Sequence, residues 1–152
     1  MDFSFLLSLL AFIMSSITWV VHAFQHSTHF SVQVIDFVAY SDNILFFLYF
    51  QNNSSSPITV SGISYITPDK KYPCELVPKV LRTEHGIVTR STPNFPLNFA
   101  PSQGAMYFID FRYCPGNSLD PDKMVDFEIY TNRGRLNKSV ALASREHLLR
   151  LR

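Results

Sequence analysis

The chain has 152 residues, which is room for one domain of ordinary size with an appendage. Thirteen basic and twelve acidic residues give a formal net charge of +1, so no strong electrostatic field draws the chain to nucleic acid, and a nucleic-acid-binding role is not expected. Fourteen Phe and seven Tyr, with only five Gly, favour strands over helices beyond the first segment.

The first segment is apolar enough to cross a membrane. Residues 3–21 carry no charge, and a helix of that length, at about 1.5 Å per residue, spans roughly the 30 Å hydrocarbon core of a bilayer. Trp19 lies near one end, where its ring suits the membrane interface. We expect a transmembrane helix over roughly residues 3–24, so that the protein is a single-pass membrane protein.

Two alternatives stay open for this segment. Residues 21–23, ahead of Phe24, fit the small-residue pattern of a signal-peptidase site, but Asp2 is the only charged residue before the apolar run, whereas an export signal normally carries Lys or Arg there. A buried core helix is disfavoured because the run has no polar stripe. Since no Lys or Arg precedes Lys70, the positive-inside rule leaves the side of the following domain undetermined.

Three histidines follow the apolar run. His22, His26 and His29 are spaced so that they would share one helical face if the helix continued past the membrane. Such a face could bind a metal or respond to pH near about 6.5. Because no nearby carboxylate precedes Asp36 to orient the imidazoles, we prefer to interpret them as polar residues of a stalk, and we expect no metal site.

After residue 30 the hydrophobic pattern takes a period of two, which is typical of half-buried strands. Apolar and polar residues alternate over residues 30–37 and again over residues 58–66. Between them, the aromatic and β-branched run over residues 44–50 predicts a central strand buried on both faces. Turn formers at residues 42–43 and 52–57 separate the three strands.

The middle of the chain is less regular. Residues 71–76 predict a short edge strand, in which Pro73 and Lys71, together with Lys70 just before it, discourage pairing with another chain. Residues 77–96 are interrupted by Pro78, Gly86, Pro93 and Pro96 and have weak periodicity, so they predict loops and short ladders.

The C-terminal half predicts three further strands. Residues 106–113 form the clearest of them. Residues 125–131 and 135–142 flank Asn132-Arg133-Gly134, which supplies the residues that a tight hairpin needs for positive φ.

Seven or eight short strands, with turn signals at intervals of about 8 to 12 residues, predict a mainly β fold, an antiparallel immunoglobulin-like β-sandwich. The sandwich is expected over residues 30–142, after an anchor and short stalk over residues 1–29 and before a basic tail over residues 143–152. The single Trp lies in the anchor, so the Cys, Trp, Cys spacing of true immunoglobulin domains is missing.

Four features carry a resemblance to a known class of protein. They are the N-terminal anchor, the alternating strands around Pro57-Ile58-Thr59-Val60, the Pro96-Leu97-Asn98-Phe99 segment and the final Thr131-Asn132-Arg133-Gly134 hairpin. Together they resemble small membrane-tethered immunoglobulin-like β-sandwich proteins of bacteria and their phages. The resemblance is one of fold and implies a tethered sandwich, and no functional residue carries over from it.

Cys74 and Cys114 are the only cysteines, and neither has a neighbour at metal-ligand spacing. In an oxidising compartment they could form one disulfide, which would close a loop of about forty residues and add a few kcal/mol of stability. In a reducing compartment they would be free thiols, buried as small hydrophobic side chains. Both alternatives stay open.

No residue set predicts catalysis. The acid pairs Asp120 with Asp122 and Asp126 with Glu128 are interpreted as solvated surface, because neither has the apolar setting that a catalytic carboxyl needs. A calcium loop around Asn117 lacks the required spacing. The tail over residues 143–152 could lie on an anionic membrane as a basic amphipathic helix, but a frayed terminus is the simpler interpretation.

We therefore expect a membrane-anchored, non-enzymatic binding or scaffolding module that acts through its β-sandwich on a protein partner. No cofactor and no small-molecule substrate are expected. The alternatives are a structural subunit of a larger membrane complex and a secreted β-sandwich protein released by signal-peptide cleavage. A hydrolase would require polar residues that converge in a pocket, for example carboxylates close to His85.

Overall fold

The computed structural model describes residues 3–26, 29–114, 119 and 123–142. One helix, α1 (Phe3–His26), precedes the strands. The strands of the described part are β1 (Phe30–Ala39), β2 (Asn43–Asn52), β3 (Ile58–Ile66), β4 (Lys71–Pro73), β5 (Val80–Glu84), β6 (Ile87–Ser91), β7 (Leu97–Phe99), β8 (Gly104–Arg112), β9 (Met124–Thr131) and β10 (Gly134–Ala141).

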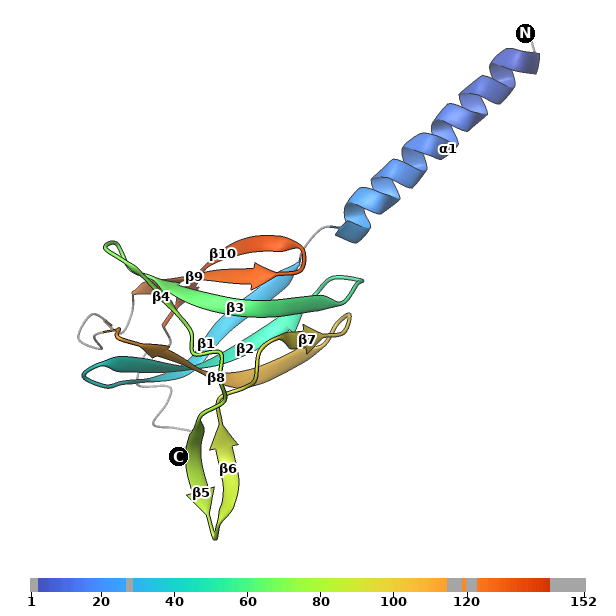
Figure 1. The fold of residues 1–152 in the computed structure, drawn as a ribbon. Helices are drawn as coiled ribbons and strands as arrows, with labels where there is room; N and C mark the ends of the chain where they lie inside the picture. Colours follow the sequence, from blue (N-terminus) through green and yellow to red (C-terminus); the bar gives the residue numbers. More distant parts are fainter. Residues whose placement is uncertain (1–2, 27–28, 115–118, 120–122, 143–152) are drawn as a thin grey trace.

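The helix α1 extends away from the strands as a separate rod (Figure 1). None of the window Phe3–Val21 is buried against the rest of the protein. The hydroxyls of Ser8, Ser16 and Thr18 each donate to the backbone carbonyl four residues earlier, at 2.8 to 2.9 Å. The alternative of a buried core helix is therefore wrong. The helix is long and apolar enough to cross a membrane, and a signal sequence would share these properties.

The strands form two stacked antiparallel sheets and a separate hairpin (Figure 1). The first sheet has the order β1-β2-β8, and the second has the order β10-β9-β3-β4, with β7 also paired to β3. The chain passes from one sheet to the other between β2 and β3, between β7 and β8, and between β8 and β9. The two sheets have the strand orders A-B-E and G-F-C-C′ of an immunoglobulin-like sandwich, so the predicted fold class is confirmed.

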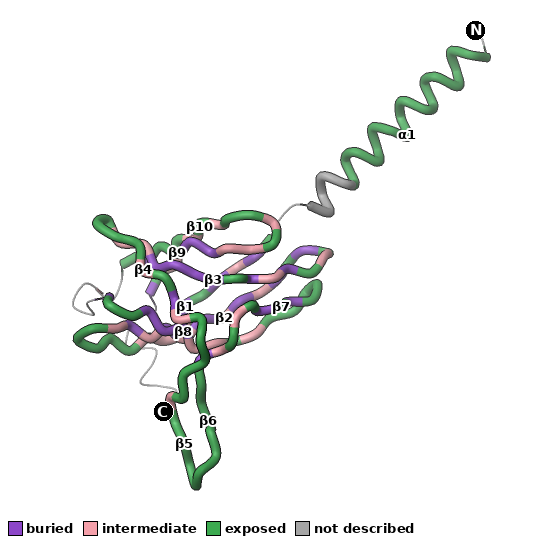
Figure 2. The backbone as a smooth tube through the Cα atoms, viewed as in Figure 1, coloured by how far each residue is buried: buried purple, intermediate pink, exposed green. Residues whose placement is uncertain are grey.

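The core lies between the sheets, as the buried stretches in Figure 2 show. Phe46 on β2 is its centre, with no exposed surface. The Phe127 ring lies 5.3 Å from it, and the Phe111 and Tyr65 rings each lie 5.7 Å from it, measured between ring centroids. Phe111 is on β8 of the same sheet, whereas Tyr65 on β3 and Phe127 on β9 belong to the other sheet, so Phe46 packs the two sheets together.

The strand β2 is buried on one face only, so the prediction that residues 44–50 are buried on both faces is wrong. Ile44, Phe46, Leu48 and Phe50 have no exposed surface, whereas the alternate residues are half-buried. The physical reason is that a two-layer sandwich has one core. No element within the described residues covers the other face of β2.

The predictions for residues 58–66 and for the C-terminal hairpin are confirmed. The predicted strand over residues 58–66 is β3, with the same bounds. The predicted C-terminal hairpin is β9–β10, and Gly134 has a φ of 107°, the conformation that favours glycine. The described part has ten strands where seven or eight were expected, because residues 77–99 form three of them, the hairpin β5–β6 and the short β7.

The sequence predicts Asn52 only as a turn residue, but its side chain is buried and takes part in several hydrogen bonds. Its amide nitrogen donates to the carbonyls of Ser56, Phe99 and Ala100, at 2.9 to 3.2 Å. Its amide oxygen accepts from the Ser54 hydroxyl at 2.6 Å. These bonds join the β2–β3 loop to the β7–β8 loop at the end of the sandwich where β1 begins.

The one-sided burial of β2 can be tested with two adjacent phenylalanines. Phe46→Ala should reduce the free energy of unfolding of residues 29–142 by about 3–5 kcal/mol, because it empties a filled core position. Phe47→Ala should cost well under half as much, since that side chain is only half-buried. Urea unfolding followed by circular dichroism measures both. Equal losses would show that the outward face of β2 is as buried as its inward face.

Candidate functional site

The surface of β1, β2 and β8 that faces away from the core is unusually apolar for a sheet without a covering layer. In an antiparallel sheet, residues directly opposite one another share a face. The register therefore gives three neighbouring rows across the outward surface. The rows are Gln33–Tyr49–Met106, Asp36–Phe47–Phe108 and Val38–Leu45–Asp110. We call this surface the outer face.

Aromatic rings lie at the centre of the outer face. The Phe47 and Phe108 rings stack with their centroids 4.4 Å apart, and the Arg90 guanidinium lies 5.8 Å from the Phe108 centroid. The Tyr49 ring covers Gly104 so closely that a Cβ there would collide with it. Met106 is 54% exposed. Aromatic residues, Met and Arg are the residues that protein interfaces favour.

The hairpin β5–β6 projects from the sandwich at the β8 side of the outer face (Figure 1). Its base is closed by two hydrogen bonds, from the Lys79 N–H to Thr92 Oγ1 at 2.7 Å and from the Thr92 N–H to the Lys79 carbonyl at 2.9 Å. Val80, Ile87 and Val88 are exposed along it. Figure 2 shows that the hairpin is exposed along its length. The outer face and the hairpin therefore meet as a floor and a wall.

A hollow of about 260 Å³ lies where the floor meets the wall. Leu45, Val80 and Leu81 contribute its apolar lining. The buried carboxylate of Asp110 accepts from the Asn43 amide at 2.9 Å and from Lys79 Nζ at 3.2 Å. Both carboxylate oxygens thus have partners, and the ion pair fixes the hairpin base to β8.

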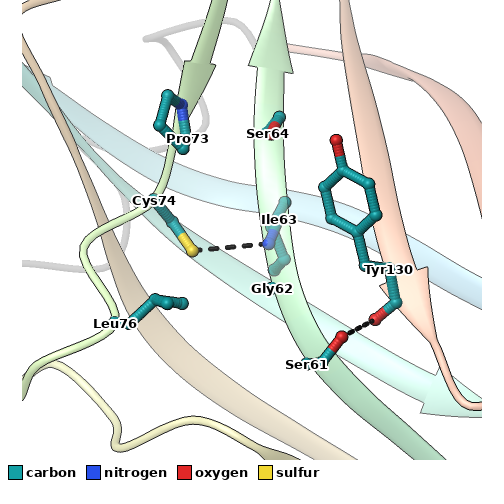
Figure 3. A pocket seen from close by; sticks show the side chains of 8 residues that line it. All are labelled: Ser61, Gly62, Ile63, Ser64, Pro73, Cys74, Leu76 and Tyr130. Carbon is teal, nitrogen blue, oxygen red and sulfur yellow. Dashed lines mark hydrogen bonds between the residues drawn. The ribbon is translucent and has the colours of Figure 1, made fainter.

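A second hollow, of about 200 Å³, lies over β3, between Tyr130 of β9 on one side and Pro73, Cys74 and Leu76 on the other (Figure 3). The Ile63 N–H donates to Cys74 Sγ at 3.3 Å, and the Cys74 N–H donates to the Ile63 carbonyl at 2.8 Å. The Ser61 hydroxyl donates to the Tyr130 carbonyl at 3.2 Å. Pockets for metabolites are usually larger, about 300–1,000 Å³, so this hollow is small for a metabolite site.

Cys74 and Cys114 are both buried, and both are free thiols in the structure. Cys74 lies opposite Phe111 of β8, not opposite Cys114. Burial raises the pKa of each thiol to about 11. Because the thiolate is the reactive form, neither cysteine has the character of a nucleophile. The disulfide between them is not formed here and stays a prediction.

The interpretation of Asp126 and Glu128 as solvated surface is wrong for Glu128. Asp126 is exposed, as expected of solvated surface, but Glu128 is buried and lies between two partners. Its Oε2 accepts from the Tyr130 hydroxyl at 2.6 Å and from Lys71 Nζ at 2.9 Å. The hydrogen bond from Tyr130, and then that from Lys71, lower the pKa of this carboxyl. Glu128 is therefore an ionised structural group that joins β4 to β9.

The remaining sequence candidates are not brought together. His85 is exposed at the turn of the β5–β6 hairpin, outside any cleft. The helix ends at His26, so His29 is not on the helical face that a histidine triad required. Within the described residues, no three His, Cys, Asp or Glu side chains gather closely enough to hold a metal. The loop with Asn117, Asp120 and Asp122 and the tail over residues 143–152 lie outside the described residues.

No protein-family model matches the chain, and no curated protein sequence matches it. Among solved structures, the chain is similar to one described as "Apo PCuAC domain from PmoF1", with 11% identity over 77% of this chain and 91% of that one and a TM-score of 0.47. It is also similar to a β-glucosidase from Kluyveromyces marxianus, with 12% identity over 75% of this chain but 14% of that one, and a TM-score of 0.28. Neither similarity is strong enough to bear on function.

The state of the cysteines can be measured directly. In the folded protein at pH 8, alkylation by iodoacetamide should be slow, because burial shields both thiols and the raised pKa leaves little thiolate. In denaturant without reductant, two thiols should react. Mass spectrometry counts the adducts in each case. No adduct until a reductant is added would instead establish the disulfide.

Proposed function

We propose that this protein is a membrane-anchored, non-enzymatic binding module whose sandwich domain contacts a protein partner through the outer face. The observation that carries the proposal is the row of half-buried aromatic side chains on β2 and β8 beside the exposed hairpin. An uncovered apolar surface of this kind marks an interaction site on a folded protein. The helix α1 would hold that surface at a membrane.

The chemistry of the outer face favours binding over catalysis. Asp110 is its buried acid, and both of its carboxylate oxygens already have partners. The buried thiols have pKa values raised to about 11, which suits packing and not nucleophilic attack. Meanwhile Phe47, Phe108 and Arg90 form an apolar centre with a cationic border, the composition that interface hot spots favour.

One alternative is favoured by a specific observation. The apolar helix has an exposed surface along its whole apolar window, so it could pack against helices of other subunits in a larger membrane complex. In that case the protein would be a structural subunit, and recovery of its partner would require the helix. A partner of the outer face would be bound by the sandwich alone.

The anchor is tested by fractionation of cells that express the full chain with a C-terminal tag. The chain should stay in the membrane pellet after alkaline carbonate extraction and keep its N-terminus, because an uncharged hydrophobic window of 19 residues holds it there. A variant without residues 1–26 should be released. A soluble chain that begins at Phe24 would overturn the anchor in favour of a secreted protein.

The binding surface is tested by a photo-cross-linking residue placed at Met106 in the full chain. A discrete cross-linked product should form, because the exposed Met106 side chain lies on the outer face. The matched control is the same residue at Asn137, which is exposed on β10 of the other sheet. Equal products from both positions, or none from either, would contradict the proposed surface.

A further inference from the structure

We propose that the partner of the outer face is a second copy of this chain, so that two sandwiches pack outer face to outer face about a twofold axis parallel to β2. This inference rests on the proposed binding function and names its partner. Two sheets that pack face to face bury their apolar side chains between them, with strand directions nearly aligned. A twofold interface must also be self-complementary, and the rows of the outer face meet that requirement.

The first argument is the placement of charge across the middle row. That row begins with Asp36 on β1, passes through Phe47 on β2 and ends with Phe108 on β8, where the Arg90 guanidinium lies over the ring. Rotation about an axis along β2 exchanges the β1 side with the β8 side. Asp36 of one copy then faces Arg90 of the other, twice in the dimer, while Phe47 faces its own copy.

Neither charged group is committed elsewhere. Among the described residues, Asp36 and Arg90 take part in no ion pair. Asp36 accepts only the N–H of its neighbour Phe37, at 2.7 Å, and Arg90 contacts the Phe108 ring. The two lie at opposite borders of the three-stranded sheet, so they do not neutralise each other within one copy. The dimer supplies each with an opposite charge.

The next row gives an apolar match. Val38, 46% exposed, lies at the β1 end of the row Val38–Leu45–Asp110. The same rotation places it over the hollow of the other copy, whose apolar lining comes from Leu45, Val80 and Leu81. The projecting hairpin of each copy then flanks the β1 side of the other. The same dimer arrangement therefore covers both the outer face and the β5–β6 hairpin of each copy.

The second argument is the direction of the chain. The axis runs parallel to the strands, so the rotation leaves the start of β1 at the same end in both copies. The helix α1 leads to that end (Figure 1). Both helices can therefore enter one membrane. An axis in the same plane but perpendicular to the strands would place the two helices at opposite ends.

The test uses the full chain in its membrane, with a single cysteine introduced at Leu45 and a short bifunctional thiol cross-linker. Leu45 lies on β2 and therefore next to the axis. A covalent dimer should form at least about tenfold more efficiently than with Asn137→Cys, which lies on the other sheet. The unchanged protein is the background control, since its cysteines are buried.

Charge reversal makes the test specific. Asp36→Arg in the Leu45→Cys chain should reduce dimer formation roughly tenfold, because it sets like charges against each other. Arg90→Asp should do the same, and the double variant Asp36→Arg with Arg90→Asp should restore the dimer. Protection of the native thiols from alkylation verifies that each variant is folded. Single variants without effect, or a double variant without recovery, would overturn the proposed pairing.

The outcomes separate this inference from the proposed function. A membrane-bound chain whose Met106 probe captures another protein, while Leu45→Cys gives no dimer, would overturn the second copy as partner and leave the binding module intact. A chain that is soluble yet cross-links through Leu45→Cys would overturn the anchor and leave the dimer intact. Dimer formed equally through Asn137→Cys would reflect crowding in the membrane and would overturn the assigned face.

Discussion

A two-layer sandwich has one core, and the rest of this structure depends on that constraint. β2 carries large apolar residues on both of its faces, but only Ile44, Phe46, Leu48 and Phe50 fit between the sheets. The alternate residues must lie on the outside, where burying them against a partner would gain roughly 25 cal/mol per Å² of apolar surface. The fold is stabilised by one face of β2, and the other face remains available for association.

At one edge of the sandwich, the segment after β4 leaves the second sheet and pairs with β8 of the first sheet. β4 pairs with β3 only as far as Pro73, after which Cys74 lies opposite Phe111 and the Glu75 N–H donates to the Asp110 carbonyl at 2.8 Å. This switch directs the chain past β8 toward Lys79, where the hairpin begins. The buried ion pair of Asp110 and Lys79 then holds the hairpin base against β8. The wall beside the outer face is therefore a consequence of how β4 ends.

Alternation in the sequence was enough to predict the fold class, because period two and turn residues report on local structure. It placed β3 and the β9–β10 hairpin closely. It could not predict how many faces of residues 44–50 are buried, since an apolar run does not reveal how many layers cover it. It also missed the buried roles of Asn52 and Glu128, whose partners are distant in the chain. The one available signal for the outer face was Met106-Tyr107-Phe108, apolar on both faces of a second strand.

The proposed anchor would restrict how two copies of the outer face can meet. A surface with Phe47 and Phe108 at its centre would be a hazard on a freely diffusing protein, because exposed apolar sheets associate without selection. Attachment to a membrane would limit the orientations in which two copies can meet and would raise their effective concentration. Only arrangements that keep both β1 N-termini toward one membrane would then be accessible. Asp36 on the β1 side and Arg90 over Phe108 on the β8 side favour, among these, the arrangement in which the β1 side of one copy faces the β8 side of the other.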